Sequence, residues 1–170
     1  MFFIREENPE DIQGISETNR KAFGQEAEVK LVETLRVREE LILSLVGVLD
    51  NQIIGFIGFS EVKVRNEEKQ SRVVACLAPM AIVPEYQQQG YGAKLIAQGL
   101  ESLKERGYSA VVVLGYPDYY PRFGFVPSID YGITCSYECP DEAFMIKVLR
   151  PGVFDGTHGV AHFCSSFAVL

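Results

Sequence analysis

Two glycines separated by one residue, Gly90 and Gly92, stand between a β-branched segment and an amphipathic segment of the chain. Glycine leaves a turn without side chains, so the N–H groups that open the following helix are accessible. These groups have no partner inside the helix, and the helix dipole makes this end electropositive. Such an end binds anions through the main chain. We therefore expect a diphosphate-bearing cofactor at residues 87–93.

Two other phosphate-binding motifs do not fit this turn. A dinucleotide fingerprint requires a third glycine, where this chain has Leu95, and a P-loop requires Gly-Lys followed by Ser or Thr. The pattern that remains is Gln87-x-x-Gly90-x-Gly92. It resembles motif A of the GNAT superfamily, the acetyl-coenzyme A dependent N-acetyltransferases.

A second pattern follows after one predicted helix and one predicted strand. An aromatic stretch begins at Gly115 and ends with the pair Gly124-Phe125. Tyr120 stands four residues before this pair. This is similar to a GNAT motif in which a tyrosine precedes Gly-Phe by four residues. The resemblance covers roughly residues 1–150, is densest between Cys76 and Val126, and is closest to a bacterial subgroup of predicted acetyltransferases. The last twenty residues show little of it.

The resemblance implies an α+β fold. Its central sheet is mixed and mostly antiparallel, has helices on both faces, and splays between two central parallel strands that carry Ala81 and Val111. The pantetheine arm of the cofactor enters that splay. We expect residues 1–150 to form the acetyltransferase domain and residues 151–170 to form a C-terminal extension packed on the same domain.

The resemblance also implies acetyl-CoA as cosubstrate and direct transfer of its acetyl group to a primary amine. Tyr120 is expected to protonate the leaving thiolate, although a tyrosine in this setting is often only a core residue. Main-chain N–H groups near Met80, Ala81 and Ile82 are expected to polarise the thioester carbonyl. The residues expected to contact the cofactor further along are Gln87, Gln88, Gln89, Gly90, Tyr91, Gly92 and Ala93.

A base must take a proton from the amine, which is almost fully protonated at neutral pH. Glu28, near the start of the second predicted helix, is the first choice. Glu26, Glu61 and Asp118 are alternatives, and a chain of water molecules is another. Each carboxylate also has an ordinary explanation as a solvated surface acid.

Small-molecule amines and peptide amines both fit as the acceptor, because no motif extends into the segments that would contact it. Two other classes of function are also open. The chain could bind acetyl-CoA as a non-catalytic sensor or regulatory module, since a fold does not determine a function. A plain protein-interaction domain is disfavoured by the glycine turn.

Composition limits the classes of partner that the chain can bind. The formal charge of −7 and the lack of a Lys/Arg cluster argue against nucleic acid, and no apolar run is long enough to span a membrane. The first residues lack the features of a signal peptide, so we expect a cytoplasmic protein.

Gln88 and Gln89 stand where many relatives carry cations, which predicts that cofactor affinity depends weakly on salt. The C-terminal extension, residues 151–170, could cover the acceptor site or form a homodimer contact.

The pairs Cys135-x-x-x-Cys139 and His158-x-x-x-His162 superficially suggest zinc. Both segments have the composition of strands, in which positions four apart lie roughly 13 Å from each other. Such positions do not share one ion, so no metal site is predicted.

Hydrophobic periodicity predicts the elements that position these residues. Asn8-Pro9 and Gly24 bound a first helix, Gly107 ends the last one, and Asp50-Asn51 forms a hairpin turn. The charged run Lys63 to Arg72 is expected to be a loop or a frayed strand end. Strands are predicted over residues 2–6, 41–49, 53–59, 73–83, 110–114, 132–137 and 144–149, and helices over residues 9–23, around 29–35 and over 90–106.

Overall fold

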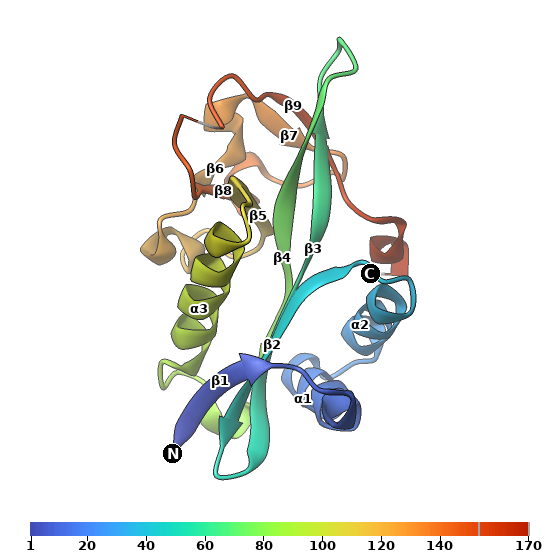
Figure 1. Ribbon diagram of the computed structural model, residues 1–170, viewed down its shortest axis with the longest axis vertical. Helices are drawn as coiled ribbons and strands as arrows, with labels where there is room; N and C mark the ends of the chain where they lie inside the picture. The colour runs from blue at the N-terminus through green and yellow to red at the C-terminus, as the bar shows by residue number, and fades with distance from the viewer. Residues whose placement is uncertain (153, 170) are drawn as a thin grey trace. The chain divides into compact units, whose positions relative to one another are not determined.

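Two long neighbouring strands, β3 (Gln52–Arg65) and β4 (Ser71–Ile82), run through both of the compact units into which the chain divides (Figure 1). The structure is a computed structural model that describes residues 1–152 and 154–169. The first unit contains residues 1–60, 78–101 and the end of the chain from Ser165, and the second contains residues 61–77 and 102–164.

In the first unit, β1 (Phe2–Glu6), β2 (Leu41–Leu49) and β3 form an antiparallel meander. Asp50 and Asn51 have φ angles of 48° and 68°, as a two-residue hairpin turn of type I′ requires. Successive strand residues point to opposite faces of a sheet. Both faces are buried here, because residues 43–48 are apolar apart from Ser44 and all six are buried.

One face is covered by α1 (Ile12–Phe23) and α2 (Ala27–Val37). A short 3₁₀ turn, η1 (Pro9–Asp11), leads into α1, and Asn8 and Asp11 form a capping box at its start. Gly24 ends α1 with a φ of 68°. The buried side chains that form the core on this face are Ile15, Val32, Val46, Val48 and Phe56.

The opposite face is covered by the beginning of α3 (Tyr91–Glu105). A Cβ atom at Gly55 would lie 2.9 Å from Leu95, and one at Gly99 would lie 2.6 Å from the ring of Phe59. Glycine at both positions therefore lets the helix approach the strands closely. The predicted placement of helices on both faces is confirmed.

In the second unit, β5 (Ala110–Leu114) runs parallel to β4, and β8 (Phe144–Val148) runs antiparallel to β5. A two-residue strand, β6 (Val126–Pro127), pairs with the far side of β8. The sheet is thus mostly antiparallel but includes the parallel β4–β5 pair, and the predicted α+β class is confirmed. One 3₁₀ turn, η2 (Pro84–Tyr86), lies between β4 and α3 in the first unit. Three others lie in the second unit: η3 (Tyr120–Phe123), η4 (Ser128–Tyr131) and η5 (Asp141–Ala143).

Two predictions about strand limits are wrong. Lys63 to Arg65 belong to β3 and Ser71 and Arg72 belong to β4, so only residues 66–70 form the hairpin loop. The strand predicted over 132–137 is β7 (Ile133–Cys135), and the chain bends at Ser136 and Tyr137. In both cases pairing with a distant strand decides where the strand ends. The partner is β9 (Gly159–His162), which pairs with β3 and β7.

The end of the chain also makes defined contacts. η6 (Ser165–Val169) lies against α2 in the first unit. The guanidinium of Arg38 donates to the hydroxyl of Ser165 at 2.7 Å, and the hydroxyl of Ser166 donates to Glu40 at 2.9 Å. The sequence offered no helical period for this segment, which is held by polar contacts.

Candidate functional site

The glycine loop, which we define as Gln87 to Ala93, connects β4 to α3 in the first unit. Gly90 has a φ of 87°, and its carbonyl accepts the first helical hydrogen bond, from the N–H of Lys94 at 3.2 Å. Gly90 is therefore the residue before the helix. By helix geometry, the N–H groups of residues 90–93 have no acceptor within α3. This arrangement can hold an anion through the main chain alone.

Two of the loop glutamines stabilise the loop itself. Gln87 donates its side-chain amide to the carbonyl of Ile82 at 2.9 Å, and Gln89 donates to the carbonyl of Glu85 at 3.1 Å. Gln88 has a φ of 61°, a left-handed conformation that few side-chain-bearing residues adopt. The glutamine run therefore shapes the turn that presents the amides.

A cation that the sequence argument missed lies at this helix end. The ammonium of exposed Lys94 lies 5.6 Å from the ring centre of Phe2 and 5.7 Å from that of Tyr91. These two rings pack on each other at 4.6 Å. A cation over two aromatic faces is held in place. The signal was available, because Lys94 is in the first turn of the predicted helix.

The parallel pairing of β4 with β5 is short. Its register joins Ala75 to Val111 and Cys76 to Val112, all in the second unit, whereas β4 continues to Ile82 and β5 to Leu114. Pro79 lacks an N–H group and interrupts the ladder within β4. Parallel strands that pair at one end only are what the predicted splay requires.

Tyr120 begins η3 in the second unit and is 8% exposed. Its ring meets those of Tyr119 and Phe125 edge-on, with centroids at 5.1 and 5.7 Å. Burial raises the pKa of its phenol, and the nearby Tyr119 and Cys76 act in the same direction. The hydroxyl makes no hydrogen bond to any residue that the structure describes. A neutral O–H donor without a protein partner is free for a bound molecule.

Gly115 fixes the position of this ring. A Cβ atom at residue 115 would lie 2.5 Å from Cε2 of Tyr120, so any side chain there displaces the tyrosine. We call residues 115–125 the tyrosine turn. Its second glycine, Gly124, ends η3 with a φ of 91°. The sequence contained both glycines, but only the fold shows that the ring of Tyr120 packs against Gly115.

Comparison with known proteins places these features in a family. The sequence profile of the acetyltransferase (GNAT) domain matches residues 3–127. The chain belongs to the GNAT acetyltransferase family. It is 38% identical over 167 residues to the uncharacterized N-acetyltransferase YhbS of Escherichia coli strain K12, covering 98% of each protein. It is also 38% identical over 135 residues to YjhQ of the same strain, covering 78% of this chain and 74% of YjhQ.

Solved structures of GNAT proteins agree with this assignment. Escherichia coli YhbS in complex with CoA superposes with a TM-score of 0.92 at 36% identity, covering 98% of this chain and 92% of that one. A GNAT acetyltransferase from Brucella melitensis in complex with acetyl-CoA gives a TM-score of 0.81 at 30% identity, covering 98% of both chains. The predicted family is confirmed.

The predicted site residues of this GNAT protein fall into two groups. Residues 80–82, the glycine loop and Glu28 belong to the first unit, and Tyr120 belongs to the second. Ala81 and Ile82 are buried, whereas residues 87–90 are exposed. The first unit therefore brings together the groups expected to act through main-chain amides.

The first two candidate bases lie near the start of α2. Glu28 accepts hydrogen bonds from the side-chain amide of Gln25 at 3.0 and 3.2 Å, one to each oxygen. Glu26 pairs with Arg20 at 2.7 Å, and this hydrogen bond lowers the pKa of Glu26. A lower pKa makes Glu26 a weaker base.

The other two candidate bases share the second unit with Tyr120. Glu61 accepts a hydrogen bond from the hydroxyl of Tyr108 at 3.1 Å. Burial and this contact raise the pKa of Tyr108 to about 12. Asp118 is exposed within the tyrosine turn. Like Glu28, Glu61 therefore accepts a hydrogen bond from a neighbouring side chain.

Within the described part of the chain, no three His, Cys, Asp or Glu side chains gather as a metal site would require. The geometric argument against a shared position for Cys135 and Cys139 is nevertheless wrong. Because β7 ends at Cys135, the spacing of a strand does not apply to Cys139, and both residues line one cavity.

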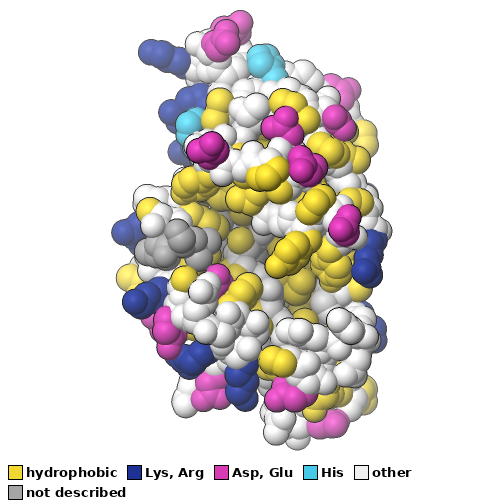
Figure 2. All heavy atoms as spheres, turned by 180° about the vertical axis from the view of Figure 1, so that it is seen from behind, with side chains coloured by type: hydrophobic (Ala, Val, Ile, Leu, Met, Phe, Trp, Pro, Cys, Tyr) yellow, Lys and Arg dark blue, Asp and Glu magenta, His cyan; other side chains and the backbone are white. Residues whose placement is uncertain are grey.

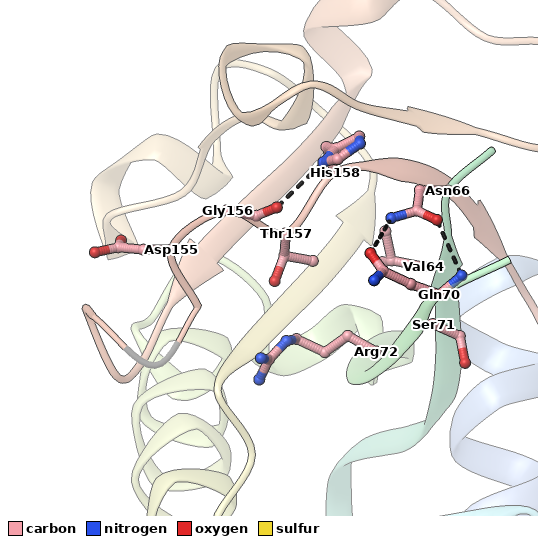
Figure 3. Close-up of a pocket in the computed structure, with 9 residues that line it drawn as sticks. All are labelled: Val64, Asn66, Gln70, Ser71, Arg72, Asp155, Gly156, Thr157 and His158. Carbon is pink, nitrogen blue, oxygen red and sulfur yellow. Dashed lines mark hydrogen bonds between the residues drawn. The ribbon is translucent and has the colours of Figure 1, made fainter. Parts of the chain in front are cut away.

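A polar cavity of about 350 Å³ lies beside the β3–β4 hairpin loop in the second unit (Figure 3). Asn66 and Gln70 are hydrogen-bonded across that loop, and His158 bonds to the carbonyl of Gly156 at 3.1 Å. None of the predicted site residues lines this cavity.

Charged side chains of both signs lie on the surface (Figure 2). On the face that Figure 2 shows, Lys and Arg side chains are interspersed with Asp and Glu side chains. Among the helices that the structure describes, none is long and apolar enough to cross a membrane.

Proposed function

We propose that this protein is an N-acetyltransferase that moves the acetyl group of acetyl-CoA directly to a primary amine. The observation that carries the proposal is the glycine loop, whose geometry leaves the amides of residues 90–93 without an acceptor within α3 in a GNAT chain. Support comes from YhbS, which is 36% identical and contains CoA, and from the Brucella melitensis relative, which contains acetyl-CoA. The amides of the loop would bind the diphosphate.

In the proposed reaction, the amine nitrogen attacks the carbonyl carbon of the thioester. A C–N bond forms, the C–S bond breaks, and the CoA thiolate leaves. Main-chain N–H groups near Met80, Ala81 and Ile82 would hold the oxygen as it becomes negative. Tyr120 would donate its proton, or a hydrogen bond, to the thiolate. The raised pKa of Tyr120 makes it a weak acid, so its contribution comes from position.

The amine must be neutral to attack. For a lysine-like amine with a pKa of about 10.4, deprotonation at pH 7 costs about 4.6 kcal/mol. We assign the base to Glu28, with Asp118 and Glu61 as alternatives, and the acceptor to the class of small-molecule or peptide amines. The formal charge of −7 favours the approach of cationic amines.

We further propose that residues 1–150 form the acetyltransferase domain, that residues 151–170 extend it, and that the protein acts in the cytoplasm. All four cysteines are thiols rather than disulfides, as they are in a reducing compartment. The tail could still make a homodimer contact, which the mass of the protein in solution with and without residues 165–170 would test.

The deciding experiment measures CoA release from acetyl-CoA against a mixed panel of amines, with acetyl-CoA binding measured separately by calorimetry. We expect binding in the absence of amine, and release that one class of amine stimulates. Binding without stimulation by any amine would instead indicate a sensor. No binding at all would refute the assignment of the glycine loop.

A further inference from the structure

Cys135 and Cys139 lie on either side of the bend that follows β7, in the second unit. Both side chains line the same cavity. Cys139 also contributes to the raised pKa of the Cys135 thiol, as a neighbouring group does. The N–H of Tyr137, between them in sequence, donates to Sγ of Cys135 at 3.4 Å. The bend therefore brings the two cysteines to one place in the second unit.

These thiols also differ in access from the other two cysteines. Cys135 and Cys139 are half-buried and both line a cavity of about 140 Å³, together with Tyr137, Glu138 and Asp141. Cys76 is fully buried in β4, and the thiol of Cys164 donates to the carbonyl of Glu61 at 3.2 Å. Cys135 and Cys139 thus share access from one cavity.

We propose that Cys135 and Cys139 form a dithiol site that a low-molecular-weight disulfide converts reversibly into a Cys135–Cys139 disulfide. One protein thiolate attacks a sulfur of the small disulfide, whose S–S bond breaks as one small thiolate leaves. The second protein thiolate then attacks the protein sulfur of this mixed disulfide and releases the second small thiolate. Two protein thiols are oxidised and lose two protons, while one small disulfide is reduced to two thiols.

The order of attack follows from the surroundings. Burial raises the pKa of the Cys135 thiol to about 11, so little of it is thiolate at neutral pH. The first attack is therefore assigned to Cys139. Cys135 completes the bond from its place in the same cavity, where proximity compensates for its small thiolate fraction.

The surrounding structure accommodates such a ring of five residues. The ring of Tyr137 packs on that of Phe163 with centroids 5.5 Å apart, and the N–H of Ser136 donates to the carbonyl of Ala161 at 3.1 Å. Both contacts involve groups that the new bond leaves unchanged. The bond restricts the unfolded chain, so the oxidised protein should melt at a higher temperature than the reduced protein.

The test uses the full chain, equilibrated with mixtures of reduced and oxidised glutathione, alkylated with iodoacetamide and cleaved after glutamate. Because Glu138 lies between the two cysteines, cleavage there leaves two peptides that stay joined only by a disulfide. We expect joined peptides at high proportions of oxidised glutathione, and their separation by dithiothreitol. The variant Cys164→Ser should keep the linkage, and Cys135→Ser and Cys139→Ser should each lose it.

Two results would overturn the proposal. One is a glutathione adduct at Cys139 with no joined peptides, and the other is a linkage of Cys135 or Cys139 to Cys76 or Cys164. A second measurement needs no substitution. Phenylarsine oxide binds two neighbouring thiols at once, so it should protect Cys135 and Cys139 together from iodoacetamide while Cys164 is alkylated. Full alkylation of the pair in its presence would equally contradict the proposal.

Discussion

The glycine loop and the tyrosine turn present their chemistry in different ways. Residues 87–90 of the loop are exposed, and the groups expected to bind the cofactor are main-chain amides. Tyr120 is 8% exposed, and its position depends on Gly115, Tyr119 and Phe125. A main-chain site depends on local backbone conformation, whereas a buried side chain depends on everything packed around it. Substitutions should therefore affect affinity in the first region and turnover in the second.

The largest expected effect is that of Tyr120→Phe. The ring and its packing remain, and only the hydroxyl is lost, so turnover should fall roughly 100-fold while the KM for acetyl-CoA is unchanged. Steady-state kinetics with the best amine of the panel measures both. Tyr119→Phe is the control, because its ring lies beside Tyr120 but outside the proposed role. Wild-type turnover in Tyr120→Phe would reduce Tyr120 to a packing residue.

Gly115→Ala should come next. The added methyl group would lie 2.5 Å from the ring of Tyr120, so we expect the ring to shift. Turnover should fall about tenfold, and overpacking should lower the free energy of unfolding by about 1–3 kcal/mol. Combined with Tyr120→Phe, the same substitution should destabilise the protein equally but cause no further loss of turnover. An additional loss in the double variant would show that Gly115 acts independently of the hydroxyl.

Gly90→Ala tests the main-chain region. Residue 90 has a φ of 87° and open space where a Cβ would be, so alanine causes backbone strain without a clash. A strain of about 1–2 kcal/mol corresponds to a roughly tenfold weaker affinity for CoA if the loop must keep this conformation. Gly107→Ala is a matched control, with a φ of 92° and equally open space at the other end of α3. Calorimetry should show weakened binding for Gly90→Ala alone, whereas equal affinities would separate the loop from cofactor binding.

Lys94→Gln should have a smaller effect. An exposed ammonium beside a bound diphosphate contributes about 1 kcal/mol or less, so affinity should fall a few-fold at low salt. The difference should vanish at 1 M salt, where the Debye length is about 3 Å. Lys104→Gln, in the last turn of α3, is the control. If affinity for CoA is independent of salt in both variants and in the wild type, Lys94 makes no contact and the prediction from Gln88 and Gln89 stands.

The smallest expected effect is on stability at high pH. Because burial raises the pKa of Tyr120, the folded state keeps the phenol neutral beyond its ordinary pKa of about 10. The free energy of unfolding contributed by this group is thus constant below about pH 10 and decreases above it, since the unfolded chain releases the proton first. Urea unfolding at several alkaline pH values should show a shallower decrease for Tyr120→Phe. Identical slopes would mean that the phenol is not desolvated.

Much of the fold followed from local patterns. Strands β1, β2 and β5 have the predicted limits, and α3 differs from its prediction by one residue at each end. Gly24 and Gly107 end helices as predicted, with φ angles of 68° and 92°. These features follow from periodicity and from glycine conformation, which neighbouring residues determine. The extension of β3 to Arg65 was missed because its partner, β9, lies about a hundred residues away.

The sequence by itself determined the GNAT resemblance, the α+β class and the glycine loop, because helix starts and left-handed turns depend on adjacent residues. Tertiary structure alone decided that Gly115 supports the ring of Tyr120, that Lys94 lies over Phe2, and that Cys135 and Cys139 line one cavity. These contacts arise when separate elements pack or when a strand ends early. Spacing along the chain carries no direct information about such distances.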